Sequence, residues 1–164
     1  MSRRIVIVLL VVLAAAGGAK VLRGDDDGGT GDAGRVVRVV DGDTIAVLVS
    51  GRREMVRYIG VDTPETRHPT KGRQCYGPAA SAFNARLVAG ERVRLERDVE
   101  ERDRYGRLLA YVYRVRDSLF VNGELVRRGY AKPLTIAPDV RHADRFLALA
   151  REARQARRGL WAEC

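Results

Sequence analysis

Five stretches of the chain are rich in β-branched and apolar residues and are short enough to be β-strands. The clearest alternation lies in residues 91–98, where Val93 and Leu95 stand between charged neighbours. Asp41-Gly42 is a favourable hairpin turn between the first two stretches. We therefore expect strands at 36–40, 45–49, 54–61, 91–98 and 107–115.

Three other stretches have the spacing and end signals of helices. In the last of them, apolar residues recur at the spacing that places side chains on one helical face, namely Phe146, Leu149, Ala150 and Ala153. Proline near the start and glycine just past the end delimit the first helix. We expect helices at about 77–89, 121–129 and 139–158. Short strands combined with these helices predict a β-rich α+β domain built on a small closed or partly closed barrel.

The first 19 residues have the layout of a secretory signal. Arg3 and Arg4 give a basic start, residues 5–16 are apolar, and small residues follow up to Ala19. The apolar run is shorter than the roughly 20 residues that a membrane-spanning helix needs. We expect export with cleavage after Ala19, which would make the protein secreted or extracytoplasmic. An uncleaved membrane anchor and a buried helix are the alternatives.

The rest of the chain divides into a linker and one domain. Residues 20–34 are acidic and glycine-rich and have little to bury, so we expect a disordered linker there. Residues 35–164 are long enough for a single domain with a core, since 46% of the chain is hydrophobic. Nothing in the sequence requires more than a monomer.

The charge and the cysteines restrict the possible partners and the compartment. The formal net charge of +9 favours binding to a polyanion such as nucleic acid, although arginine-rich surfaces can also serve only solubility. Cys75 and Cys164 can form a disulfide in an oxidising compartment, so that bond is expected if the protein is exported. The two cysteines and two histidines have no spacing typical of zinc sites.

Carboxylates and arginines gather where the predicted strands end. If Asp43 and Asp62 approach each other on adjacent strands, their repulsion calls for a cation, and carboxylates with a backbone carbonyl and water suit Ca²⁺. Nearby arginines could bind a phosphodiester whose oxygens gain negative charge during attack. Glu65 could orient or deprotonate the attacking water. Together these residues predict a phosphodiesterase site.

Several motifs, in order and at similar spacing, resemble the staphylococcal nuclease family. They are "VVDGDTIAV", "VRYIGVDTPETRHP" with "YGPAASAF", "DRYGRLLAYVY" and "VNGELVRRGYAK", and the resemblance spans roughly residues 36–161. It implies a five-stranded OB-fold-type barrel with three helices. It also implies a Ca²⁺-dependent nuclease that acts on DNA and RNA and leaves 3′-phosphate ends.

The resemblance assigns roles to individual positions. Asp43, Asp62 and the backbone carbonyl of Thr63 correspond to the metal ligands, with Asp41 just outside them. Glu65 corresponds to the general base or water-positioning glutamate. The two arginines that bind the scissile phosphate and its transition state correspond to Arg57 and Arg107. The pair that contacts a terminal phosphate corresponds to Arg104 and Tyr105, where the family has lysine and tyrosine.

One departure from the family pattern bears on substrate binding. Tyrosines follow the second helix in well-studied members, whereas residues 131–142 here contain none. Two other functions fit the same barrel: a binding module with an eroded site, and an anchored surface domain in which a metal only braces the loops. All the catalytic residues that the family motif requires are present, so we expect an enzyme.

Overall fold

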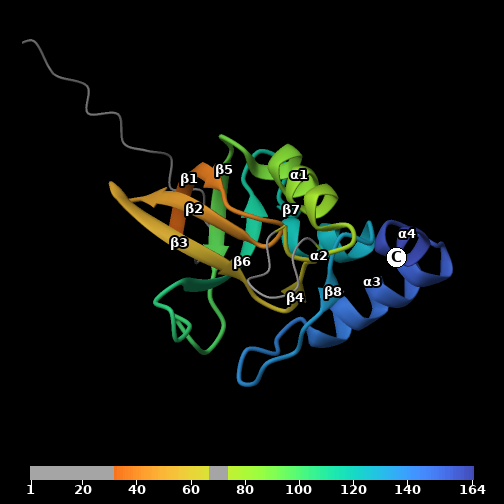
Figure 1. The fold of residues 1–164 in the computed structure, drawn as a ribbon. Coiled ribbons are helices and arrows are strands. Elements are labelled where there is room, and N and C mark those ends of the chain that lie inside the picture. The colour runs from red at the N-terminus through yellow and green to blue at the C-terminus, as the bar shows by residue number, and fades with distance from the viewer. Residues whose placement is uncertain (1–31, 67–73) are drawn as a thin grey trace, which may run out of the picture.

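The computed structural model describes residues 32–66 and 74–164. The predicted signal or anchor and most of the predicted linker lie outside these residues. Within them, five strands close into a barrel (Figure 1). They are β1 (Asp32–Val39), β2 (Thr44–Val49), β3 (Arg52–Tyr58), β5 (Arg92–Glu96) and β6 (Leu108–Arg114).

The strand pairing explains the closure. Neighbours in the order β3-β2-β1-β5-β6 are antiparallel, and β3 then pairs with β6 in parallel, with Val56 opposite Leu108. The short strand β7 (Leu119–Phe120) pairs antiparallel with the end of β6, and β4 (Val61–Asp62) pairs with β8 (Lys132–Pro133) beside the barrel. The predicted OB-fold-type barrel is therefore confirmed.

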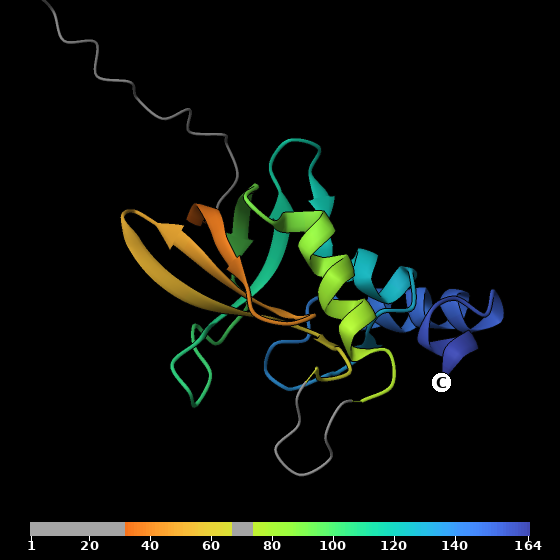
Figure 2. The same ribbon diagram turned by 45° about the horizontal axis from the view of Figure 1, so that its top comes forward.

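The helices gather on one side of the barrel. They are α1 (Gly77–Val88), α2 (Val121–Arg127), α3 (Ala143–Gln155) and the short α4 (Leu160–Glu163). The β2–β3 hairpin extends away from them, and α4 lies at the opposite end of the molecule (Figure 2). None of the helices in the described part of the chain is long and apolar enough to cross a membrane.

The core lies inside the barrel and between the barrel and the helices. Its largest fully buried side chains include Tyr58, Tyr111 and Phe146. Buried Asn122 ties α2 to the barrel, since its Nδ2 donates to the carbonyl of Ile59 at 2.9 Å and its Oδ1 accepts from the N–H of Val112 at 2.9 Å. These two hydrogen bonds satisfy buried backbone groups of the barrel and fix the position of α2 against it.

Two predicted boundaries differ from the structure at the ends of strands. β1 begins at Asp32, inside the predicted linker, because Gly34 lets this segment lie against β2: a Cβ there would be 2.6 Å from the carbonyl oxygen of Leu48. The predicted strand 54–61 is broken after Tyr58, where Gly60 adopts φ +79° beneath the ring of Phe146.

The third predicted helix begins later than expected. It starts at Ala143 because the side chain of Asp139 caps a loop instead of opening the helix. Its Oδ1 accepts the N–H groups of Val99 and Glu100, both at 2.9 Å. A carboxylate that satisfies two loop N–H groups favours the turn conformation over an extra helical turn.

Candidate active site

The turn between β1 and β2 places a buried carboxylate at the edge of the barrel. Asp43 is 5% exposed, and its Oδ2 accepts from the N–H of Thr63 at 2.8 Å and from the Thr63 hydroxyl at 2.9 Å. The hydroxyl of Thr44 donates to Oδ1 at 3.2 Å. Gly42 makes this approach possible, since a Cβ at that position would lie 2.7 Å from the Cβ of Thr63. The Asp43 carboxylate thus joins this turn to the segment after β4.

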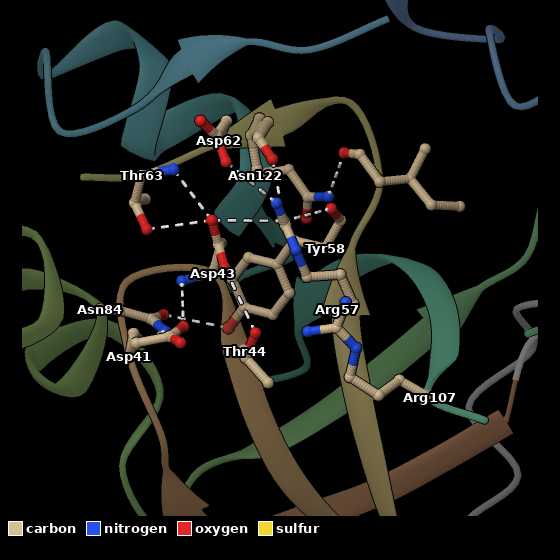
Figure 3. A network of polar contacts seen from close by, with 12 residues as sticks. Asp41, Asp43, Thr44, Arg57, Tyr58, Asp62, Thr63, Asn84, Arg107 and Asn122 are labelled. Carbon is tan, nitrogen blue, oxygen red and sulfur yellow. Dashed lines mark hydrogen bonds and ion pairs between the residues drawn. The ribbon is translucent and has the colours of Figure 1, made fainter. Parts of the chain in front are cut away.

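Arg57 lies between two carboxylates (Figure 3). Its Nη1 is 3.3 Å from Oδ2 of Asp43, and its Nη2 is 3.3 Å from Oδ1 of Asp62. The same Nη1 donates to the carbonyls of Tyr58 at 3.0 Å and Val61 at 2.8 Å. Backbone acceptors therefore hold the guanidinium rigidly, with only 15% of the side chain exposed.

Negative charge is concentrated around Asp43. Burial and repulsion from Asp43 raise the pKa of Asp41 to about 6. Burial and the same repulsion raise the pKa of Asp62, although Arg57 partly opposes the shift. Such crowding of carboxylates favours a bound cation.

The donors at this position suit a hard, partly hydrated ion. Asp43 and Asp62 supply carboxylate oxygens, and the N–H bond of Thr63 to Asp43 anchors the peptide that follows Asp62. Among the described residues, no three acidic, histidine or cysteine side chains form a complete metal-binding group. The chemistry of the set still fits Ca²⁺, because that ion takes backbone carbonyls and water beside carboxylates.

Two buried residues that the sequence analysis did not single out support the turn. The hydroxyl of Tyr58 donates to Oδ1 of Asn84 at 3.0 Å, and Nδ2 of Asn84 donates to the carbonyl of Asp41 at 3.0 Å. Burial raises the pKa of Tyr58, so this phenol remains a hydrogen-bond donor. The available signal was Asn84 itself, a polar residue on the buried face of α1 between Ala80 and Val88.

A second arginine is held by the loop before β6. Asp103 accepts from Nε of Arg107 at 2.6 Å through Oδ2, and from the N–H groups of Tyr105 and Arg107 through Oδ1. Burial alone would raise the pKa of Asp103, but these hydrogen bonds lower it below its usual value. Arg104 donates to the Tyr105 hydroxyl at 2.7 Å. Asp103 was not among the predicted site residues, although its i,i+4 spacing to Arg107 across a turn was a signal.

Arg57 and Arg107 both line a pocket of about 520 Å³. Its lining combines the cationic side chains of Arg57, Arg104 and Arg107 with Tyr105 and apolar residues such as Leu134 and Ile136. It also contains three carboxylates, those of Glu100, Asp103 and Asp139. Ile136 and Leu134 are 60% and 38% exposed and stand on the segment that lacks tyrosines. A ligand with an anionic group and a flat apolar group fits this lining.

Most of the predicted site residues thus fall into two groups that share Arg57. Asp41, Asp43, Asp62, Thr63 and Arg57 belong to one polar network. The three predicted phosphate-binding residues of the other loop line the pocket with Arg57 and are Arg104, Tyr105 and Arg107. Glu65 is exposed two residues beyond Thr63, and its charge contributes to the raised pKa of Asp62. Cys75 and Cys164 are joined by a disulfide bond.

Known proteins place this architecture in a family. The model of the family described as "Staphylococcal nuclease homologue" matches residues 55–163. Thermonuclease of Staphylococcus hyicus is 39% identical over 127 residues, which cover 77% of this chain and 74% of that protein. Thermonuclease of Staphylococcus intermedius is 41% identical over 131 residues, with 80% and 77% covered. Endonuclease YncB of Bacillus subtilis is 40% identical over 128 residues, with 77% and 60% covered.

The chain therefore belongs to the staphylococcal nuclease family.

Proposed function

We propose that the protein is an exported, Ca²⁺-dependent nuclease that hydrolyses phosphodiester bonds of DNA and RNA. The observation that carries the proposal is the position of Arg57, which contacts Asp43 and Asp62 and shares a pocket with Arg107. A cation site and a phosphate site are thereby adjacent. The thermonuclease and endonuclease relatives support the same activity.

In this proposal the carboxylates hold the metal. Asp43, Asp62 and the carbonyl of Thr63 would hold Ca²⁺, an ion that accepts carboxylate, carbonyl and water oxygens. Asp41 lies outside these ligands and accepts the N–H of Asp43 at 3.1 Å, which orients that residue. The bound ion would supply positive charge that polarises the phosphoryl oxygens.

The arginines and Glu65 carry out the remaining chemistry. Arg57 and Arg107 bind the scissile phosphate and stabilise the charge that its oxygens gain in the transition state. Glu65 orients the attacking water and accepts its proton as the new P–O bond forms. The bond from phosphorus to the 5′ oxygen breaks, this oxygen gains a proton from solvent, and the phosphate stays on the 3′ oxygen.

Substrate binding uses the rest of the pocket. Arg104 and Tyr105 contact a terminal phosphate, and the net charge of +9 attracts the polyanion over a longer range. The protein acts as a monomer outside the cytoplasm after export by its first 19 residues.

Product analysis tests this function. Purified protein is incubated with end-labelled single-stranded DNA and with RNA in the presence of Ca²⁺, and the chemistry of the new ends is determined. We expect cleavage of both substrates to products with 3′-phosphate ends. Products with 3′-hydroxyl ends would contradict the proposed bond cleavage. Tight binding without cleavage would instead identify a binding module on the same barrel.

A further inference from the structure

The backbone of Glu65 is held on both sides by Gln74. The N–H of Glu65 donates to Oε1 of Gln74 at 2.9 Å, and the N–H of Gln74 donates to the carbonyl of Glu65 at 3.1 Å. Both backbone groups of Glu65 are therefore bound to one residue nine positions later. This paired arrangement restrains the direction in which the exposed Glu65 side chain leaves the backbone.

The start of α1 packs against the Glu65 peptide. Gly77 donates its N–H to the carbonyl of Gln74 at 3.1 Å, and a Cβ at Gly77 would lie 2.8 Å from the carbonyl carbon of Glu65. The helix thus packs directly on the Glu65 peptide at a place where only glycine fits. Two residues before Glu65 in the sequence, Thr63 is bound to Asp43. Glu65 lies between two anchored points.

A covalent bond holds the residue next to Gln74. Cys75 is joined to Cys164 across 89 positions of sequence, with Cα atoms 6.1 Å apart. The partner segment is itself anchored, because Leu160 is 4% exposed and its N–H donates to the carbonyl of Gly129 at 2.9 Å. Because Cys75 is exposed and contributes little to the core, this bond is what ties its side chain to another part of the chain.

We propose that Gln74 is a positioning residue for Glu65, and that the Cys75–Cys164 disulfide holds Gln74 in the place from which it does so. The proposal rests on the proposed function, in which Glu65 orients the attacking water. A carboxylate on an exposed side chain needs a fixed backbone to remain aligned with a reacting atom. A misplacement of about 1 Å can lower the rate of an enzyme by about a hundredfold.

Three variants test the role of Gln74. Gln74→Ala removes the acceptor and should lower kcat by about ten- to a hundredfold while KM changes less than about twofold. Gln74→Glu keeps an acceptor oxygen and should retain kcat within about fivefold of wild type. The control Gln155→Ala removes an exposed glutamine at the end of α3 and should leave kcat unchanged. All rates are measured well below each variant's melting temperature.

A double-mutant cycle separates positioning from a general structural effect. In a Glu65→Gln background, Gln74→Ala should lower the residual rate by less than about twofold, because its route to the chemistry is already lost. An equal loss of rate in both backgrounds would overturn the proposal. Unchanged kcat in Gln74→Ala would overturn it as well.

Hydrogen exchange tests the contact independently of activity. The amide of Glu65 should exchange slowly in the wild-type protein and at least about tenfold faster in Gln74→Ala. The double variant Cys75→Ser/Cys164→Ser should show the same faster exchange and a lower kcat. If the Glu65 amide exchanged at the wild-type rate in both Gln74→Ala and the double cysteine variant, the proposal would be overturned. If the wild-type protein cleaves no nucleic acid, the proposed function fails, while this exchange result still decides whether Gln74 restrains Glu65.

Discussion

Replacing Arg57 by lysine should separate the structural and catalytic roles of the guanidinium. Arg57 donates to the carbonyls of Tyr58 and Val61 and contacts Asp43 and Asp62 at 3.3 Å. A lysine keeps the charge but has a single nitrogen, so it cannot reach both carbonyls and both carboxylates. At least one buried acceptor would lose its partner.

The expected stability loss follows from the one acceptor left without a partner. An unpaired buried acceptor costs about 1–3 kcal/mol, so Arg57→Lys should lower the free energy of unfolding by that amount. A domain of this size has about 5–15 kcal/mol to lose, and the variant should remain folded. Urea unfolding at neutral pH measures the change.

The catalytic loss should be larger than the stability loss. Removing one preorganised donor from a developing oxyanion costs about 2.7–4 kcal/mol, which corresponds to a fall in kcat of about 10²–10³. The assay is hydrolysis of single-stranded DNA at saturating Ca²⁺. Arg57→Lys with kcat within about threefold of wild type would refute the assignment of this residue to the transition state.

Two matched lysine variants complete the experiment. Arg107→Lys should lose activity to a similar extent but should change stability by less than about 1 kcal/mol, because Arg107 is 30% exposed and a lysine can still pair with Asp103. Arg53→Lys, on the exposed face of β3, should change neither quantity. Equal stability losses in the variants of Arg57 and Arg107 would contradict the structural argument.

Three further variants make separate predictions. Glu65→Gln should bind Ca²⁺ normally by calorimetry and lose most activity, and an unchanged rate would remove Glu65 from the mechanism. Ile136→Tyr adds an aromatic ring to the pocket rim and should lower KM for single-stranded DNA at least about fivefold, since stacking contributes about 1–3 kcal/mol per base; an unchanged KM would contradict this. Burial lowers the pKa of His142, and repulsion from Arg145 and Arg141 adds to the shift despite Glu96 and Asp98. His142 therefore gains its proton at a higher pH in the unfolded chain than in the folded protein. The free energy of unfolding should fall as pH drops below about 6.5. His142→Phe should weaken this loss in urea unfolding at pH 7 and 5, and an identical loss would contradict the assignment.

The strands and helices were predictable because burial on one face leaves a periodic pattern. Alternation in 91–98 marked β5, and the apolar stripe of 139–158 marked α3. The patterns predicted a closed or partly closed barrel but not which strands close it, because β3 and β6 pair in parallel across a long separation in sequence. Gly34 resembled a linker residue, yet it allows close strand packing.

The site residues were expected from family motifs, but their contacts were not. A motif cannot say that Arg57 lies between Asp43 and Asp62, because that arrangement depends on the break after Tyr58 and on the carbonyls that this break exposes. The supporting roles of Asn84 and Asp103 depend likewise on tertiary contacts. The local sequence shows that Asn84 and Asp103 are polar, but it does not show which groups they bind.

The most direct test of the proposed nuclease function measures Ca²⁺-dependent hydrolysis by the wild-type protein and by Asp43→Ala. Single-stranded DNA and RNA are incubated with each protein in Ca²⁺, in Mg²⁺ and in a chelator, and folding of both proteins is checked by circular dichroism. We predict that the wild-type protein cleaves both substrates in Ca²⁺ alone, and that folded Asp43→Ala loses this activity. Cleavage that persists in the chelator, or an unaltered rate in Asp43→Ala, would contradict this prediction.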